Sequence, residues 1–132
     1  VYAVGTASAM VEWQRENTPA ELLDRIHPVL GGETTIPLDD ASADLAVMMN
    51  VHHELADPVA SYREALRVLR DGGQLLVVDW LPGVPGEGPE DEVRVAPEMI
   101  AAVIASAGFG DVEIGEGFEK HSLITAVKPA SR

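Results

Sequence analysis

The sequence predicts an α/β fold, a mostly parallel Rossmann-like sheet that ends in an antiparallel hairpin. Apolar segments of strand length alternate with segments of helical periodicity up to residue 107, which is typical of parallel sheets with right-handed crossovers. The last two apolar segments, 112–116 and 123–128, lie too close together for an intervening helix and should pair antiparallel. Hydrophobic residues make up 46% of the 132-residue chain, which is enough for the core of at most one domain.

The first half of the chain is expected to contain three strands and two helices. Residues 1–4 are a short apolar run bounded by Gly5, as in a buried strand, and residues 9–16 indicate a helix. Thr18-Pro19-Ala20-Glu21 is a helix start signal, with a Thr cap followed by Pro at the first helical position. Strands should follow at 26–30, where Pro28 indicates an edge position, and at 44–50, which reads as buried.

The second half predicts two helices around a central strand. Asp57-Pro58 should open a helix that ends at Gly72-Gly73, with one apolar face formed by Val59, Tyr62, Leu66 and Leu69. Residues 74–80 predict a strand, and residues 81–95, rich in Pro, Gly and acids, predict a loop. A helix over 97–107 should end before Gly108, with a buried side formed by Ile100, Val103, Ile104 and Ala107.

Charge and cysteine content exclude several classes of function. The 9 Lys and Arg against 22 Asp and Glu give a net charge of −13, which disfavours nucleic acid and anionic membranes as partners. With no cysteine, disulfides, thiolate nucleophiles and Cys-based zinc sites are excluded, and a cytoplasmic location is expected. The N-terminus does not resemble a signal peptide, and no apolar run approaches the roughly 20 residues of a membrane span.

Four segments are candidates for chemistry because each follows a predicted strand. In open α/β sheets, ligands bind beyond the carboxyl ends of the strands. This rule selects residues 5–10, 31–34, 50–54 and 79–81.

The segments VYAVGTASAM, GGETTIP, MMNVHHELADP and RVLRDGGQLLVVDW together resemble class I S-adenosylmethionine (SAM)-dependent methyltransferases, in particular small bacterial members of the type 11 group. The resemblance enters the family at its second strand, so the first strand and its Gly-rich turn would lie upstream of Val1. It implies SAM as cofactor and a small-molecule acceptor. It implies cofactor-binding roles for Gly5, Thr6, Met10, Gly32, Glu33, Asn50 and Val51, and catalytic roles for His52 and His53.

Two positions depart from the family pattern. Gly5 stands where the family has an acid that binds both ribose hydroxyls, so either cofactor affinity is weakened, or Glu12 or an upstream segment compensates. Gly32 stands where the family most often has Asp, with Glu33 beside it either as a replacement or as a plain loop acid. An alternative register, with residues 5–9 as the Gly-rich first loop, leaves too short a distance to Asp44.

The two adjacent histidines allow a structural and a catalytic reading. On an extended segment His52 and His53 should face opposite ways, which argues against one shared metal ion. Each could bridge loop backbone, or one could position or deprotonate the acceptor. His27 and His121 are isolated, so no metal site is expected.

The residues that follow the next predicted strand are expected on the acceptor side of the site. Asp79 and Trp80 could form a wall of the acceptor pocket, although Trp80 could equally pack in the core. The loop segment GEGPEDEVRV resembles a substrate-covering segment of the family.

Three functions follow from these features. The first is methyl transfer from SAM to a small molecule by a domain that runs from the family's second strand to its C-terminus, residues 1–132. The second is a catalytically degenerate partner or scaffold subunit, and the incomplete sheet leaves open a homodimer formed through it. The third, a dehydrogenase fragment, is disfavoured by the terminal hairpin.

Overall fold

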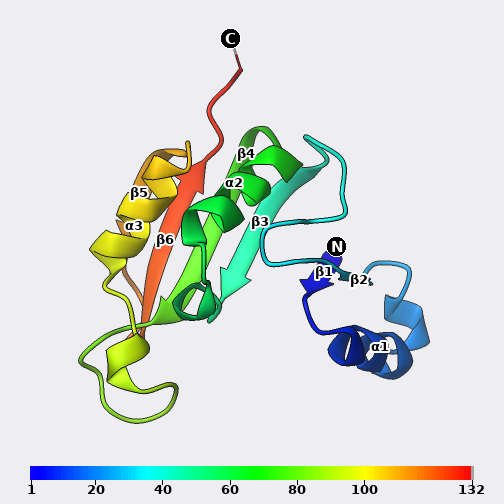
Figure 1. Ribbon diagram of the computed structural model, residues 1–132, viewed down its shortest axis with the longest axis horizontal. Coiled ribbons are helices and arrows are strands. Elements are labelled where there is room, and N and C mark those ends of the chain that lie inside the picture. The colour runs from blue at the N-terminus through cyan, green and yellow to red at the C-terminus, as the bar shows by residue number, and fades with distance from the viewer. Residues whose placement is uncertain (132) are drawn as a thin grey trace. The chain divides into compact units, whose positions relative to one another are not determined.

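The computed structural model describes residues 1–131 and divides into two compact units, Val1–Leu38 and a second unit that begins at Asp39 (Figure 1). The first unit contains β1 (Tyr2–Gly5), α1 (Ser8–Asn17), the short 3₁₀ helix η1 (Ala20–Leu22) and β2 (His27–Leu30). β1 and β2 pair in parallel, with Gly5 opposite Leu30. The two strands and the first helix of this unit are therefore confirmed.

The helix predicted to start at Thr18 is wrong. The backbone N–H of Thr18 bonds to the Gln14 carbonyl, so Thr18 closes α1 instead of capping a new helix. Only η1 follows, without a side-chain cap. The physical reason is the short path to β2, because Arg25 and Ile26 both bond back to the Leu22 carbonyl and turn the chain into the strand.

The second unit is a four-stranded mixed sheet covered by two helices. Its elements are β3 (Ala43–Met49), η2 (His52–Glu54), α2 (Pro58–Val68), β4 (Leu69–Trp80), η3 (Asp91–Val93), α3 (Pro97–Ser106), β5 (Gly110–Gly115) and β6 (His121–Val127). The strand order is β3-β4-β6-β5, with β3 parallel to β4 and β6 antiparallel to both of its neighbours. The α/β class and the C-terminal antiparallel hairpin are confirmed.

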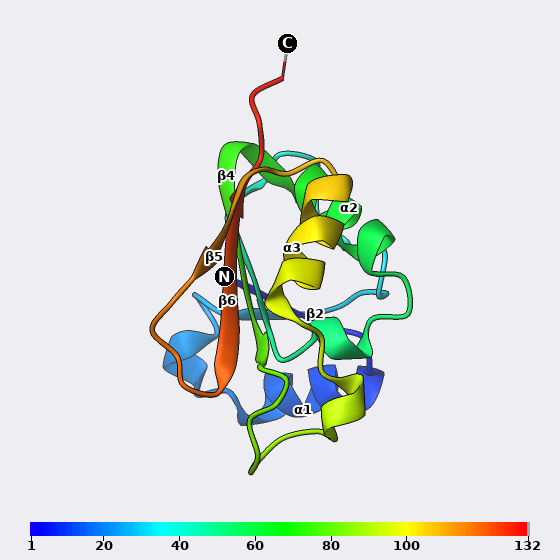
Figure 2. The same ribbon diagram turned by 90° about the vertical axis from the view of Figure 1, so that its left-hand side faces the viewer.

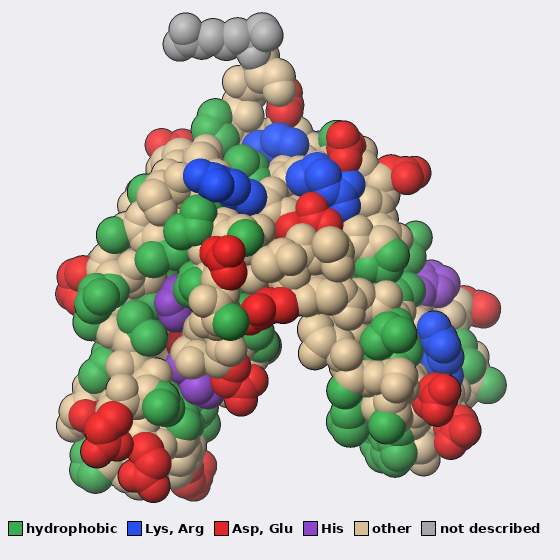
Figure 3. Space-filling view, in the orientation of Figure 1, with side chains coloured by type: hydrophobic (Ala, Val, Ile, Leu, Met, Phe, Trp, Pro, Cys, Tyr) green, Lys and Arg blue, Asp and Glu red, His purple; other side chains and the backbone are tan. Residues whose placement is uncertain are grey.

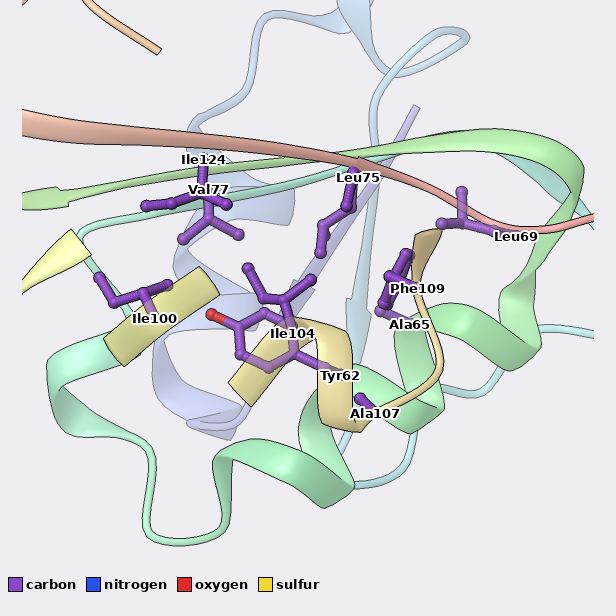
Figure 4. Packing of buried hydrophobic residues seen from close by; sticks show 11 residues of the cluster. Tyr62, Ala65, Leu69, Leu75, Val77, Ile100, Ile104, Ala107, Phe109 and Ile124 are labelled. Atoms are coloured by element: carbon purple, nitrogen blue, oxygen red, sulfur yellow. The ribbon is translucent and has the colours of Figure 1, made fainter. Parts of the chain in front are cut away.

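The core of this unit lies between its sheet and its two helices. Figure 2 shows α2 and α3 on the same side of the sheet. Tyr62 of α2 and Ile100 and Ile104 of α3 are fully buried, and Figure 4 shows them packed against β4 and β6 side chains. The Asp57 carboxylate caps α2 by accepting from the Ala60 N–H at 3.1 Å. The predicted buried faces are therefore confirmed except for Leu69, which is buried but lies in β4 and not in α2.

One prediction of burial and one prediction of a helix boundary are wrong in this unit. β3 is buried on one face only: Ala46 and Met48 pack against the core, whereas Leu45, Val47 and Met49 are about half exposed. Strand alternation sends these three side chains to the face opposite the helices. The helix α2 ends at Val68 and not at Gly72-Gly73, because Leu69 already pairs with Ala43, and the two glycines lie within β4.

Three positively charged side chains of this unit are engaged with neighbours. Figure 3 shows Lys and Arg gathered at the end near the C-terminus. Arg67 pairs with Glu64 and Asp40, Arg70 pairs with Asp44, and the Lys128 ammonium donates to the Leu69 carbonyl. The longest described helix, α2, has 11 residues, and none of the helices described is long and apolar enough to cross a membrane.

Candidate functional site

The candidate site lies at the carboxyl end of the parallel pair β3 and β4. Met49 is opposite Val78 in the register, so the segments after both strands begin side by side. The Asn50 N–H donates to the Val78 carbonyl at 2.7 Å and holds the two strand ends together. Asn50, the turn η2 and Asp79 are therefore brought to one edge of the sheet, where ligands of such folds bind.

Asp79 holds His53 through two hydrogen bonds. Its carboxylate accepts from the His53 backbone N–H at 2.8 Å and lies 2.7 Å from His53 Nδ1. A third donor, the Trp80 N–H, reaches the same carboxylate at 2.8 Å. Asp79 is 1% exposed. A buried carboxylate with three donors is fixed in orientation, and it fixes the imidazole beside it.

The hydrogen bond to Asp79 determines which His53 nitrogen is free. An ionised carboxylate only accepts hydrogen bonds, so Nδ1 must carry the proton, and in the neutral ring Nε2 keeps its lone pair. The nearest carboxylate to Nε2 is that of Glu54, whose Oε1 lies 3.8 Å away on an exposed side chain. Nε2 is therefore the ring nitrogen of His53 that can accept a proton, while Nδ1 stays bonded to Asp79.

The His53 side chain is only 8% exposed, and His52 differs from it chiefly in the group to which its Nδ1 bonds. His52 is 4% exposed, and its Nδ1 lies 2.6 Å from the hydroxyl of the fully buried Tyr62. Burial lowers the pKa of His52, and burial raises the pKa of Tyr62, so both groups are held neutral. The segment is a 3₁₀ turn, not the extended segment expected from the sequence, but the two imidazoles still bond to different partners.

Asn50 combines a rare backbone conformation with an unsatisfied side-chain atom. Its φ is +57°, a left-handed value that is uncommon outside glycine and that concentrates at functional sites. Its Oδ1 is buried and has no hydrogen-bond partner among the described residues. SAM presents an ammonium group and hydroxyls, which are donors, so the orphaned acceptor fits this cofactor. Val51 follows as the residue before η2 and is partly exposed.

The other predicted cofactor residues belong to the first unit. The Gly5 carbonyl accepts from the Gly31 N–H at 2.9 Å, so Gly5 and Gly32 are brought to the same edge of the β1–β2 pair. Thr6, Met10 and Glu33 follow these strand ends with exposed side chains. A Cβ atom at Gly5 would lie 3.2 Å from Val11 Cγ2, which is close but leaves room for a side chain after a small shift.

Two parts of the site were missed from the sequence. Asp79 was expected at the acceptor wall and not as the partner of His53, although a single acid at the end of an apolar strand is a signal for a partnered buried carboxylate. The second is Arg94, whose guanidinium donates to backbone carbonyls of the loop after β4 and which no local sequence pattern marks. Within the described residues, no group of three His, Cys, Asp or Glu side chains could hold a metal ion.

Comparison with known proteins identifies the family. A family model described as "Methyltransferase domain", of the type 11 group, matches residues 1–77. The chain belongs to this family. An uncharacterised 37.1 kDa protein in a transposon of Streptomyces fradiae is 39% identical over 82 residues, which are 61% of this chain and 23% of that protein. The matched segment of this chain thus spans less than a quarter of that relative.

Solved structures agree with this family. A SAM-dependent methyltransferase from Aquifex aeolicus superposes with a TM-score of 0.88 at 25% identity, covering 96% of this chain and 67% of that one. The human N-acetylserotonin methyltransferase in complex with SAM superposes with a TM-score of 0.76 at 20% identity, covering 98% and 40%. The second likeness shows the fold alone. The predicted resemblance to class I methyltransferases of the type 11 group is confirmed.

Proposed function

We propose that the protein transfers the methyl group of SAM to an oxygen or nitrogen atom of a small-molecule acceptor, and that His53 removes the proton from that atom. The observation that carries this proposal is the pair His53 and Asp79, joined at 2.7 Å at the carboxyl end of β4. Family membership supports the cofactor, and the Aquifex aeolicus protein is a SAM-dependent methyltransferase. The net charge of −13 favours a small molecule over nucleic acid.

Three residues of the second unit have separate roles in the proposed reaction. Asn50 would hold a donor of the cofactor through its free Oδ1. When bound, SAM supplies a methyl group on a positively charged sulfur. His53 Nε2 accepts the proton of the acceptor O–H or N–H, which makes an electron pair of that atom more nucleophilic toward the methyl carbon, and the electrons of the broken carbon–sulfur bond would stay on the sulfur of the cofactor. Asp79 keeps the proton on Nδ1 and stabilises the imidazolium. Alignment of the reacting groups supplies the larger part of the acceleration in such reactions.

The other assignments remain predictions. His52, which the resemblance made a catalytic candidate, is given a structural part here because its imidazole is buried against Tyr62. Gly5, Thr6, Met10, Gly32 and Glu33 stay predicted cofactor residues. A scaffold subunit that binds no SAM is the alternative that the experiment must separate from the enzyme.

The test uses the full-length protein, SAM and a panel of small phenols, alcohols and amines. SAM binding is measured by calorimetry, and transfer is followed with a radiolabelled methyl group. His53→Gln should lower kcat by about 10²–10⁴-fold, as expected for loss of a general base, with SAM affinity unchanged. His27→Gln, in the first unit, should behave like the wild type. Absence of SAM binding would support the scaffold, and full turnover by His53→Gln would exclude His53 as the base.

A further inference from the structure

The segment between β4 and α3, residues 81–94, is organised around one side chain. The Arg94 guanidinium donates to four backbone carbonyls of its own loop, those of Leu81, Val84, Glu87 and Pro89, at 2.7–3.1 Å. These carbonyls are spread over nine residues of the loop. Because a guanidinium carries five donors in a rigid fork, one arginine can hold several carbonyls at once.

Trp80 anchors the same loop to the sheet. The Arg94 Cζ lies 5.4 Å from the Trp80 ring centroid, within the range of a cation–π contact. A Cβ atom on Gly88 would lie 2.7 Å from the indole ring, so the loop backbone rests directly on it. The ring of His121, which is opposite Trp80 in the register, lies 4.3 Å away by centroids. The indole is thus held between the loop and β6.

Further hydrogen bonds hold the loop to itself and to the residue before β6. The Gly83 N–H donates to the Asp91 carboxylate at 2.7 Å, and the Leu81 N–H donates to the Lys120 carbonyl at 2.9 Å. The Arg94 N–H returns to the Asp91 carbonyl at 3.1 Å in η3. The loop borders an open hollow of about 490 Å³, which is lined by the loop's own residues.

The loop begins two residues after Asp79, at the sheet end that carries His53. We propose that Arg94 is a positioning residue that fixes residues 81–94 as a preformed wall on the acceptor side of the site. The acceptor part of this proposal rests on the proposed function, whereas the preformed shape does not. The wall is acidic, since Figure 3 shows Asp and Glu side chains gathered over this loop, and the exposed acids are Glu87, Glu90, Asp91 and Glu92. Neutral or cationic acceptors should therefore be preferred to anionic ones.

Hydrogen exchange on the full-length protein without ligand tests the preformed shape. The amides of Gly83 and Arg94 should exchange slowly in the wild type, and Arg94→Met should speed them by about tenfold or more, because four charge-assisted hydrogen bonds are lost together. Arg94→Lys should resemble Arg94→Met, since an ammonium cannot span the four carbonyls. Arg63→Met, an exposed arginine on α2, is the control. Fast exchange in the wild type, or no change in Arg94→Met, would overturn the proposal.

A pair of glycine variants tests the contact with Trp80. Gly86 and Gly88 both have positive φ, at 124° and 95°, so an alanine strains both, but only at Gly88 would the new Cβ strike the indole. In a Trp13→Phe background, Gly88→Ala should red-shift the Trp80 emission and Gly86→Ala should not. Equal shifts would show that the strain of an alanine at positive φ, and not a clash of its Cβ atom with the indole, changes the surroundings of Trp80, and they would contradict the contact.

The kinetic readout tests the role in positioning. With an acceptor found in the panel above, Arg94→Lys should raise the acceptor KM by about tenfold or more and leave SAM affinity unchanged. An unchanged acceptor KM, beside a loosened loop, would refute the positioning role. Failure of the proposed function would instead appear as absent SAM binding or absent turnover in the wild type, while the exchange result stands.

Discussion

Replacing Asp79 by Asn removes one acceptor from a group that serves three donors. The carboxylate oxygen Oδ1 accepts from His53 Nδ1 and the Trp80 N–H, and Oδ2 accepts from the His53 N–H. A carboxamide has one oxygen and one NH₂ in the same space. If its oxygen takes the Oδ1 place, the His53 N–H faces the NH₂. If it takes the Oδ2 place, the Trp80 N–H does. Either way one backbone donor beside the buried side chain is left without an acceptor.

The size of the effect follows from this count. One unsatisfied buried donor costs about 1–3 kcal/mol, and the two remaining bonds weaken by roughly 1 kcal/mol each when the acceptor loses its charge. Relief of the carboxylate desolvation offsets part of this loss. We therefore expect the free energy of unfolding of Asp79→Asn to fall by about 2–4 kcal/mol. In the second orientation the NH₂ also forces His53 Nδ1 to accept, so Nε2 carries the proton and cannot remove another.

Two measurements check this reasoning. Urea unfolding followed by Trp80 emission in a Trp13→Phe background gives the stability, and kcat with a panel acceptor gives the catalytic effect, expected to be about 10²–10⁴-fold. Asp44→Asn, which removes an exposed partner of Arg70, is the matched control and should remain close to the wild type. Wild-type stability together with wild-type kcat in Asp79→Asn would refute the role of this carboxylate.

Three further results are expected. Burial lowers the pKa of His52 below its ordinary 6.5, so the unfolded chain binds a proton first as the pH falls. The free energy of unfolding should therefore decrease from pH 6.5 downward. His52→Gln should remove this part of the slope, as measured by urea titrations at several pH values. Asn50→Gly keeps the left-handed backbone and removes Oδ1, so SAM affinity should fall by about tenfold or more in calorimetry, whereas an unchanged affinity would separate Asn50 from the cofactor. Gly5→Asp should tighten SAM binding if the family register is right, after a small shift of Val11, and unchanged affinity would count against that register.

The elements that the sequence predicted well have strong local signals. The helix α2 was found because Asp57 and Pro58 mark its start and Tyr62 lies on a regular apolar face. β4 and the hairpin β5–β6 follow from apolar runs separated by turn residues. The helix expected after Thr18 failed because the same residue can close one helix or open the next, and the choice depended on the distance to β2.

The details of the site depend on contacts that no local pattern contains. His53 and Asp79 are 26 residues apart, and their bond exists because β3 and β4 end side by side. Arg94 meets Leu81 across 13 residues of a loop whose composition predicts only that it is irregular. The sequence could place the strand ends at which a ligand binds, but not the partner of each polar side chain there.

The adjacent histidines show how the hydrogen-bond partner of an imidazole determines what the ring can do. Both are imidazoles of one three-residue turn, and both have Nδ1 engaged. The Tyr62 hydroxyl can donate or accept and carries no charge, so it holds His52 without stabilising a cation, and burial then keeps that ring neutral. The Asp79 carboxylate can only accept, so it both fixes the proton on Nδ1 of His53 and stabilises the charge that arrives at Nε2. The bond to Asp79, and not the pair of histidines by itself, is therefore the basis for proposing His53 as the catalytic residue.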